Sequence, residues 1–467
     1  FEIHRMMLED TDYCDPVSEL IKTEKVCAEY AVNTAGSRLA QDFADMDDEY
    51  MKARAIDVYD VSKRVIEILS GEGQALDRGN DPAILAADDF TPSETAQLDR
   101  SKVLALVSRQ GAANSHTAIF ARTMGIPAII GFGAFLTDDL SGKEVILDGD
   151  TGTLYAEPDP EIIKTLEEKK VALQKEKEKL EKLRGKPTCT SGGRKIKLFA
   201  NIGSVSDADA ARAGDAEGVG LFRSEFLYLG RNDYPDEDTQ YGSYRKALEK
   251  MGGREVVIRT LDIGADKQAD YFNLPKEENP ALGMRAIRIC LTRPDIFKTQ
   301  LRAIYRASVH GSAAIMFPMI TSLDELRRAK KIAQQVRESL AADNIPFDNA
   351  VPIGIMIETP ASAIISDVLA AESDFFSIGT NDLTQYTLAI DRQNDSIAAF
   401  CDIHHESILR LIKLTCDNAH KAGIWCGICG SLGADTALTK TFVEMGIDEL
   451  SVEPSRILKL RSIIAEC

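Results

Sequence analysis

The sequence has no apolar run that approaches the roughly 20 residues a helix needs to span a membrane. It also lacks a basic excess, because 55 Lys and Arg stand against 74 Asp and Glu, a net charge of −19. Binding to nucleic acid needs a basic surface, so this charge argues against such a partner. The first residues, Phe1 to His4, do not form a signal peptide, which begins with basic residues and a long apolar stretch. We therefore expect a cytoplasmic protein without membrane insertion.

Cysteine is also scarce, with nine residues in a chain of 467. This number does not form a disulfide framework at such a length, and reduced thiols fit a cytoplasmic location. Cys426 and Cys429 have the CxxC spacing of redox and zinc sites, but no second CxxC or histidine pair accompanies them. A redox or metal role is therefore disfavoured. The Cys429 thiol, at the end of a predicted strand, is a candidate proton donor instead.

The length predicts roughly two to four domains. Residues 1–75 read as helical, because apolar residues from Met51 to Leu69 recur at spacings of three and four. Residues 79–158 contain short apolar runs between turn residues, typical of strands, at 83–87, 103–107, 126–130 and 145–147. Residues 159–190 form a lysine- and glutamate-rich helical linker.

From residue 191 to 467 a strand–helix pattern repeats. Eight short apolar runs alternate with helical stretches such as 323–340 and 406–422, and the runs are 196–200, 217–222, 256–261, 313–317, 352–357, 375–378, 423–428 and 449–452. Eight strand–helix units over this length predict an α/β fold, a (β/α)₈ or TIM barrel.

The active site of such a barrel lies at the carboxyl ends of its strands. The polar or sulfur-containing residues at these ends are Asn201, Arg223, Arg259, Met319, Glu358, Asn381, Asp382, Cys429 and Glu453. Two carboxylates without a His or Cys ligand set suit Mg²⁺. Arginines suit a multiply charged anion, so a small phosphorylated carboxylate would satisfy both groups. The alternative is that the arginines pair only with neighbouring acids.

A second candidate centre is His116, which follows the small-residue turn from Gly111 to Ser115 and begins a predicted helix. Backbone N–H groups at a helix start favour a negatively charged group. A histidine can accept a phosphoryl group and then release it. The alternative is a buried, hydrogen-bonded histidine, which we prefer for His310, His404, His405 and His420.

Several segments together resemble enzyme I, the phosphoenolpyruvate (PEP)–protein phosphotransferase family of the bacterial sugar phosphotransferase system. The likeness covers nearly the whole chain in one order. Its segments are Ser115-His116-Thr117 with Ile126-Pro127-Ala128, residues 217–226, residues 259–264, residues 276–280, residues 354–360 and residues 377–386.

The resemblance implies that His116 takes the phosphoryl group of PEP and passes it to the histidine phosphocarrier protein HPr, the first step of sugar uptake. It implies Mg²⁺ held by Glu358 and Asp382, and a proton given to the enolpyruvate product by Cys429. The residues that it implies bind PEP are Arg223, Arg259, Asn381, Asp382, Arg392, Lys267 and Arg285.

The resemblance further implies a homodimer formed through the barrel at 191–467, preceded by a swivelling β/β/α phosphohistidine domain at 79–158. Motion of that domain is expected through linkers near 76–82 and 155–190. Because the family's chain begins before Phe1, we expect a fragment in which 1–78 is a partial helical carrier-binding subdomain. We also expect the family's last segment to be cut short at Cys467.

Some positions depart from the family pattern, namely Ala113 and Asn114 before His116, Met284, and Ser431 after Cys429. A pyruvate–phosphate dikinase or PEP synthase is a rival assignment, but the chain before His116 is too short and too helical for an ATP-binding domain. A second rival is a PEP sensor without transfer activity, which would bind PEP but not phosphorylate His116.

Overall fold

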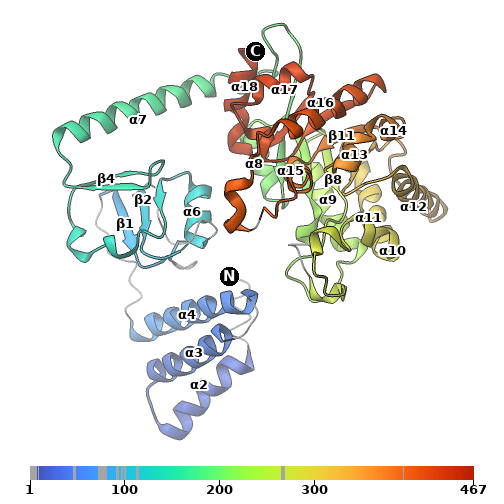
Figure 1. Cartoon of the computed structure of the whole chain (residues 1–467). Helices are drawn as coiled ribbons and strands as arrows, with labels where there is room; N and C mark the ends of the chain where they lie inside the picture. Colours follow the sequence, from blue (N-terminus) through green and yellow to red (C-terminus); the bar gives the residue numbers. More distant parts are fainter. Residues whose placement is uncertain are drawn as a thin grey trace. The chain divides into compact units, whose positions relative to one another are not determined.

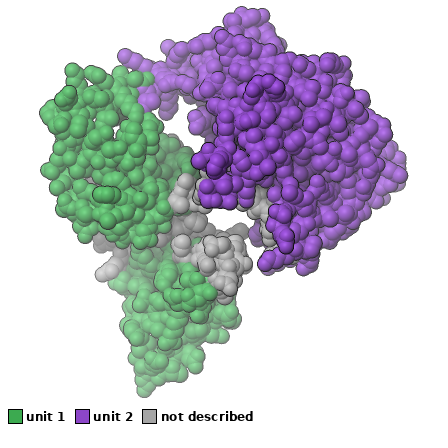
Figure 2. Space-filling model, viewed as in Figure 1, with its two compact units in different colours: residues 1–172 green, residues 173–467 purple. Residues whose placement is uncertain are grey.

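A computed structural model of the chain describes residues 8, 10–45, 49–71, 81–90, 94–95, 98, 101–111, 115–264, 269–392 and 394–467. The chain divides into two compact units, residues 1–172 and 173–467 (Figure 2). Figure 1 gives the labels of the elements used below. Among the described residues, no helix combines the length and apolar character needed to cross a membrane.

The first unit begins with three helices, α2 (Thr11–Glu24), α3 (Ala28–Ala44) and α4 (Glu49–Ser70). Apolar side chains that recur at helical spacing bring α3 and α4 together around Ala40, Val58 and Val61, which are buried. A buried hydrogen bond between Tyr13 Oη and Ser62 Oγ, 2.9 Å long, joins α2 to α4. The predicted helical character of residues before 75 is thus confirmed for the described part.

The rest of the first unit contains two small sheets. Strands β1 (Ala83–Ala87), β2 (Val103–Ser108) and β3 (Ala128–Ile129) are parallel, and β4 (Val145–Asp148) pairs with β5 (Thr153–Ala156) in an antiparallel hairpin. Helix α6 (His116–Met124) lies between β2 and β3 in the chain. Four predicted strands are confirmed, whereas β5 was missed.

Helix α7 (Pro160–Glu181) has no buried residue, as expected for a solvated connecting helix. Its Lys169 Nζ lies 2.8 Å from Asp148 Oδ2, and its Glu176 forms an ion pair with Lys459. The chain divides within this helix, after residue 172. The domain boundaries predicted at 158 and 190 remain predictions.

The second unit is a closed barrel of eight parallel strands, in the order β10-β11-β12-β13-β6-β7-β8-β9. The strands are β6 (Lys197–Ile202), β7 (Gly218–Arg223), β8 (Val256–Arg259), β9 (Ala313–Phe317), β10 (Ile353–Ile357), β11 (Phe375–Ile378), β12 (Trp425–Ile428) and β13 (Glu449–Val452). Every predicted run therefore overlaps a strand. Closure comes from the pairing of β13 with β6, in which Glu449 lies opposite Lys197.

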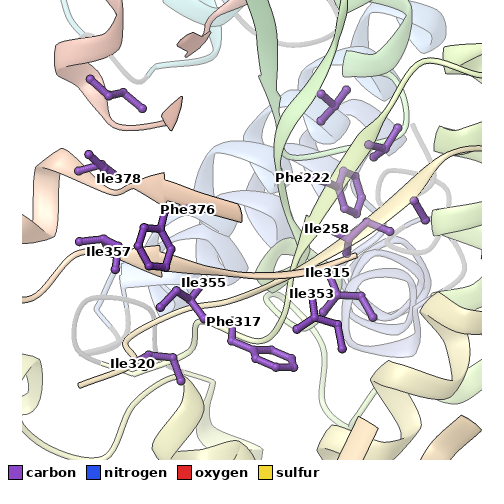
Figure 3. Close-up of a cluster of buried hydrophobic side chains, with 14 of the residues drawn as sticks. Phe222, Ile258, Ile315, Phe317, Ile320, Ile353, Ile355, Ile357, Phe376 and Ile378 are labelled. Carbon is purple, nitrogen blue, oxygen red and sulfur yellow. The ribbon is translucent and has the colours of Figure 1, made fainter. Parts of the chain in front are cut away.

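Helices between the strands cover the outside of the barrel (Figure 1). They are α8 (Asp207–Ala213), α9 (Glu237–Met251), α10 (Ile287–Thr292), α11 (Pro294–Ala307), α12 (Leu323–Ala342), α13 (Pro360–Ile364), α14 (Ser366–Ala370), α15 (Thr380–Leu388), α16 (Glu406–Lys421), α17 (Thr439–Met445) and α18 (Ile457–Ala465). Outward strand residues such as Phe222, Ile258, Ile315 and Phe376 form a buried apolar layer with them (Figure 3).

Inward residues form a separate core, because alternate side chains of a strand point to opposite faces. This core contains Val257, Met316, Met356, Phe375 and Cys429. The Phe375 ring stacks on the Trp425 ring, with centroids 4.6 Å apart and planes 2° from parallel. The stack fills the interior and leaves room for only a hydrogen at Gly354, where an added Cβ would lie 2.5 Å from the Phe375 ring.

We expect Gly354→Ala to lower the free energy of unfolding by about 1–3 kcal/mol, because the stacked ring has little freedom to move aside. Gly242→Ala is the matched control in helix α9. Its added Cβ would meet no heavy atom of the described residues within 4 Å. This change should raise the free energy of unfolding by about 0.5–1 kcal/mol. Urea unfolding measures both, and equal effects of the two variants would contradict the packing argument.

Candidate active site

Arg259, the last residue of β8, is held between two carboxylates at the rim of the barrel. Its Nη2 lies 2.5 Å from Glu225 Oε1, and its Nη1 lies 3.0 Å from Asp262 Oδ2. All three side chains are almost fully buried. Charge-assisted bonds on both sides fix the guanidinium plane, while its buried Nε has no hydrogen-bonding partner among the described residues.

Arg285, just before α10, extends the same network. Its Nη2 donates to Asp262 Oδ1 at 3.1 Å, and its Nη1 donates to Tyr386 Oη at 2.8 Å and to Asp382 Oδ1 at 3.4 Å. Asp262 therefore bridges the two arginines. Arg259 thus pairs with two neighbouring acids, and its role in binding substrate remains a prediction. Arg223 differs, because it is exposed and lies over the Phe226 ring at 5.2 Å.

Glu358 follows β10 and is completely buried. Its Oε1 accepts a hydrogen bond of 2.6 Å from the backbone N–H of Met319, whose φ of 57° is unusual for a non-glycine residue. Its Oε2 has no partner among the described residues. Burial and the charges of Asp382 and Asp262 raise the pKa of Glu358 to about 8, although the two arginines oppose this shift.

The buried charges at the rim do not balance. Glu225, Asp262, Glu358 and Asp382 bring four carboxyl groups, whereas Arg259 and Arg285 bring two guanidinium groups. Two further positive charges would compensate the four carboxylates if all were ionised. A divalent cation fits this deficit and the unpartnered oxygen of Glu358.

The carboxyl groups at the rim fit Mg²⁺ better than a metal ion that takes all of its ligands from the protein. Among the described residues, no group of three or more His, Cys, Asp or Glu is arranged to hold a metal ion. Mg²⁺ is commonly bound by one or two carboxylates, with water and substrate phosphate as its other ligands. Glu358 and Asp382, the latter in the first turn of α15, supply such carboxylates.

Cys429 directly follows β12 and is 4% exposed. Burial raises the pKa of its thiol to about 12; a side-chain hydrogen bond with Ser377 and the charge of Arg259 oppose this effect, and Glu449 and Glu358 add to it. The thiol is therefore protonated at neutral pH and is suited to donate a proton. Its backbone carbonyl accepts a hydrogen bond of 3.1 Å from Asn201 Nδ2, another strand-end residue.

Asn381 and Ser431 contact each other beside Cys429. The Oδ1 of Asn381 accepts hydrogen bonds from the backbone N–H and the hydroxyl of Ser431, at 2.9 and 2.7 Å. Ser431, which departs from the family pattern, thus holds the Asn381 amide in one orientation. Both of these bonds go to Oδ1, so the Nδ2 group of Asn381 points away from Ser431.

A cavity of about 630 Å³ adjoins the charged network. Arg285, Asp382 and Arg392 line it, together with Tyr386 and residues 278–282, which include part of a family motif. Its volume suits a small ligand. The structure therefore brings Arg285, Asp382 and Arg392 to one cavity, although they come from separate loops and helices. Lys267, also predicted to bind substrate, lies outside the described residues.

His116 is the first residue of α6, as predicted. Ser115 caps this helix by accepting a hydrogen bond from the N–H of Ala118 at 3.3 Å. The buried Thr117 hydroxyl donates to Asp89 Oδ1 at 2.8 Å, which ties the first helical turn to the end of β1. Of the positions that depart from the family pattern here, Ala113 and Asn114 lie outside the described residues.

Sequence reasoning gave no role to Glu225, Asp262 or Tyr386, which orient the two arginines. All three lie in segments quoted for the family resemblance or directly beside predicted residues. Their position within those motifs was the feature of the sequence that could have indicated a role for them. Their contacts join residues far apart in the chain and were not predictable from local spacing.

Three family profiles match the chain. They are described as PEP-utilising enzyme, PEP-binding domain (residues 177–467), PEP-utilising enzyme, mobile domain (residues 79–152), and PEP-utilising enzyme, N-terminal (residues 1–54).

Similar curated proteins carry the name phosphoenolpyruvate-protein phosphotransferase. The one from Bacillus sp. (strain S) is 43% identical over 465 residues, which cover 99% of this chain and 80% of that protein. Those from Priestia megaterium and Bacillus subtilis (strain 168) are each 42% identical over 467 residues, or 100% of this chain and 82% of theirs.

The buried Glu358 carboxyl should make stability depend on pH. Its pKa rises from an ordinary 4.5 to about 8 on folding, so folding binds a proton between these values. The free energy of unfolding should therefore fall from pH 4.5 to 8, by up to about 1.4 kcal/mol for each pKa unit, and Glu358→Gln should remove this component.

Urea unfolding at pH 5 and pH 8 with a chelator present measures this difference between wild type and variant. Glu453→Gln, at the end of β13, is the control because its carboxylate is exposed. It should retain the wild-type pH dependence. A Glu358→Gln variant with the same pH dependence as wild type would show that the buried carboxyl is not the source.

Proposed function

The chain belongs to the phosphoenolpyruvate–protein phosphotransferases, a family of PEP-utilising enzymes, and we propose that it carries the phosphoryl group of PEP through His116 to HPr, the first step of sugar uptake by the phosphotransferase system. The chain is a transferase that catalyses PEP-dependent phosphoryl transfer. The route through His116, the carrier and the sugar-uptake role are the parts that we propose.

The observation that carries the proposal is the charged network at the rim of the barrel. PEP has a phosphate and a carboxylate, and two buried arginines in fixed orientation suit these two anionic groups. Arg259 and Arg285 each have a buried Nε without a partner among the described residues, and substrate oxygens would satisfy both. Arg223, Asn381 and Arg392 would bind the substrate from more exposed positions.

Phosphoryl transfer requires mainly alignment and charge compensation. In the proposed reaction a ring nitrogen of His116 attacks the phosphorus of PEP, and the bond from phosphorus to the enol oxygen breaks. The arginines neutralise charge on the phosphoryl oxygens and the leaving oxygen. Bound Mg²⁺, held by Glu358 and Asp382, would supply further electrostatic stabilisation at these oxygens.

The leaving group is the enolate of pyruvate, which becomes pyruvate when its C3 carbon takes a proton. Cys429 is the proposed donor, because its thiol is protonated at neutral pH and lies at the rim with Arg259 and Glu358. Its proton passes to C3, and a thiolate remains. Protonation removes the enolate and so favours transfer of the phosphoryl group from PEP, while the reverse reaction from pyruvate stays possible when the thiolate takes the proton back.

We further propose that residues 1–78 contribute to binding HPr and that the barrel forms a homodimer. The acidic net charge of −19 is compatible with a basic partner. A PEP sensor without transfer activity is the second candidate, and labelling of His116 separates the two.

Incubation with PEP and Mg²⁺ should add one phosphoryl group to the protein, measured as intact mass. The adduct should be acid-labile, as a phosphohistidine is, and His116→Ala should abolish it. His310→Ala is the matched control, because the contacts of this histidine with the Tyr241 hydroxyl at 3.0 Å and with Glu249 at 3.7 Å lie outside the candidate site. A labelled His116→Ala variant would disprove the assignment, and PEP binding without any adduct would favour the sensor.

Removal of the proposed proton donor gives a separate prediction. Cys429→Ala should lower the rate of pyruvate formation by about 10²–10⁴-fold, because the enolate loses its acid. The KM for PEP should change little, since the thiol carries no charge with which to bind the substrate. Cys426→Ala removes a buried thiol on the helix-facing layer and should leave the rate near that of wild type. Equal losses in both variants would contradict the role of Cys429.

A further inference from the structure

A second carboxyl group lies inside the barrel, away from the rim. Glu449 is the first residue of β13 and is 0% exposed. Neither Oε1 nor Oε2 has a hydrogen-bonding partner among the described residues. Burial of a polar group without partners is costly, so such a residue calls for an explanation.

Two glycines make room for this carboxyl group. A Cβ at Gly427 in β12 would lie 1.9 Å from Glu449 Oε2, and a Cβ at Gly220 in β7 would lie 2.4 Å from Oε1. The carboxyl group therefore occupies interior space that side chains at both positions would otherwise fill. Any larger residue at either position would displace it.

This placement brings the carboxyl group below the Cys429 thiol. Cys429 directly follows β12 and lies two residues after Gly427, so their side-chain positions face the same side. Two residues of a strand span about 6.6 Å. The Glu449 carboxyl thus lies one layer of interior side chains beneath the proposed proton donor.

Two hydroxyl groups flank the space between them. Ser377 in β11 lies opposite Gly427 in the strand register, and its buried side chain interacts with the Cys429 thiol. Ser451 in β13 also points inward, since a Cβ at Gly220 would lie 2.6 Å from its Oγ. Ser451 donates to Asn201 Oδ1 at 2.7 Å, so its proton is committed to that bond, whereas the Ser377 hydroxyl interacts with Cys429.

The surroundings favour the neutral acid. The interior core contains the apolar residues Leu221, Val257, Met316 and Phe375 together with Cys429. Burial raises the pKa of Glu449 well above its usual value; Lys197 opposes this shift and Glu255 adds to it. These surroundings therefore favour the protonated form of the Glu449 carboxyl group.

We propose that Glu449 returns a proton to the Cys429 thiolate after each protonation of enolpyruvate, with the Ser377 hydroxyl as the relay. The inference rests on the proposed function of Cys429. The Ser377 hydroxyl gives its proton to the thiolate and takes the proton of the Glu449 carboxyl group. Cys429 becomes a thiol again, Ser377 is unchanged, and Glu449 is left as a carboxylate that later takes a proton from solvent. Glu449 acts through Cys429 and is a positioning residue, since it does not touch the substrate.

The test follows two isotopes in the reversible half-reaction, which needs no carrier protein. The enzyme is incubated in D₂O with Mg²⁺, PEP and ¹⁴C-labelled pyruvate. Transfer of ¹⁴C into PEP reports phosphoryl transfer in both directions, which can reuse the same cysteine proton. Entry of deuterium into the pyruvate methyl group requires that the cysteine proton exchange with solvent. Non-enzymatic deuterium entry is subtracted.

In Glu449→Gln, which keeps the size of the side chain, we expect deuterium entry to fall by about tenfold or more while ¹⁴C transfer stays within about twofold. Ser377→Ala should show the same change in the ratio of the two rates. Glu444→Gln, an exposed carboxylate in α17, is the matched control and should leave the ratio unchanged. Thermal unfolding checks that each variant is folded. If Glu449→Gln does not fold, the ratio of the two rates in Ser377→Ala decides whether the relay operates.

An equal fall of both rates would mean that Glu449 only supports the structure, and no change in either would mean that the thiol exchanges by another route. Both results overturn the inference. Absence of ¹⁴C transfer in the wild-type enzyme would instead contradict the proposed function, so the two failures are distinguishable.

Discussion

The pairing of β13 with β6 is the interaction on which the rest of the second unit depends. It joins Glu449–Val452 to Lys197–Ala200 and converts a parallel sheet into a closed barrel. Closure brings the carboxyl ends of all eight strands to one rim. Residues more than 200 positions apart, such as Asn201 and Cys429, thereby come within hydrogen-bonding distance, 3.1 Å for Asn201 Nδ2 to the Cys429 carbonyl.

The rim of the barrel gathers more carboxyl groups than its two buried arginines can neutralise. Arg259 and Arg285 share Asp262, and Glu358 and Asp382 complete the group. In a buried setting this imbalance raises the pKa of Glu358 and leaves one of its oxygens without a partner among the described residues. A phosphorylated, multiply charged substrate and a divalent cation would together complete the ion pairs. The excess of buried carboxyl groups thus accounts both for the raised pKa of Glu358 and for the proposed binding of a cation and an anionic substrate.

The supply of protons to Cys429 is a second constraint that the barrel imposes. The buried position that keeps the Cys429 thiol protonated also separates it from solvent. The glycines at 220 and 427 admit a carboxyl group below it, where an apolar side chain would pack more favourably. A barrel interior is normally filled with branched apolar side chains. The polar groups between Cys429 and Glu449 depart from this pattern and therefore point to a role other than packing.

The sequence alone determined the α/β class, the eight barrel strands, the helix start at His116 and the residues at the strand ends. These features depend on local periodicity and on the rule that barrel strands end at the active site. Strand β5 was missed, and the roles of the predicted site residues remain predictions, with Lys267 outside the described part. Only the tertiary structure decided that Glu225 and Asp262 orient Arg259, that Ser431 orients Asn381, and that Glu449 lies beneath Cys429. Those contacts join distant residues, and their distances are set by barrel closure, register and the space left by glycines, none of which is encoded in a local pattern.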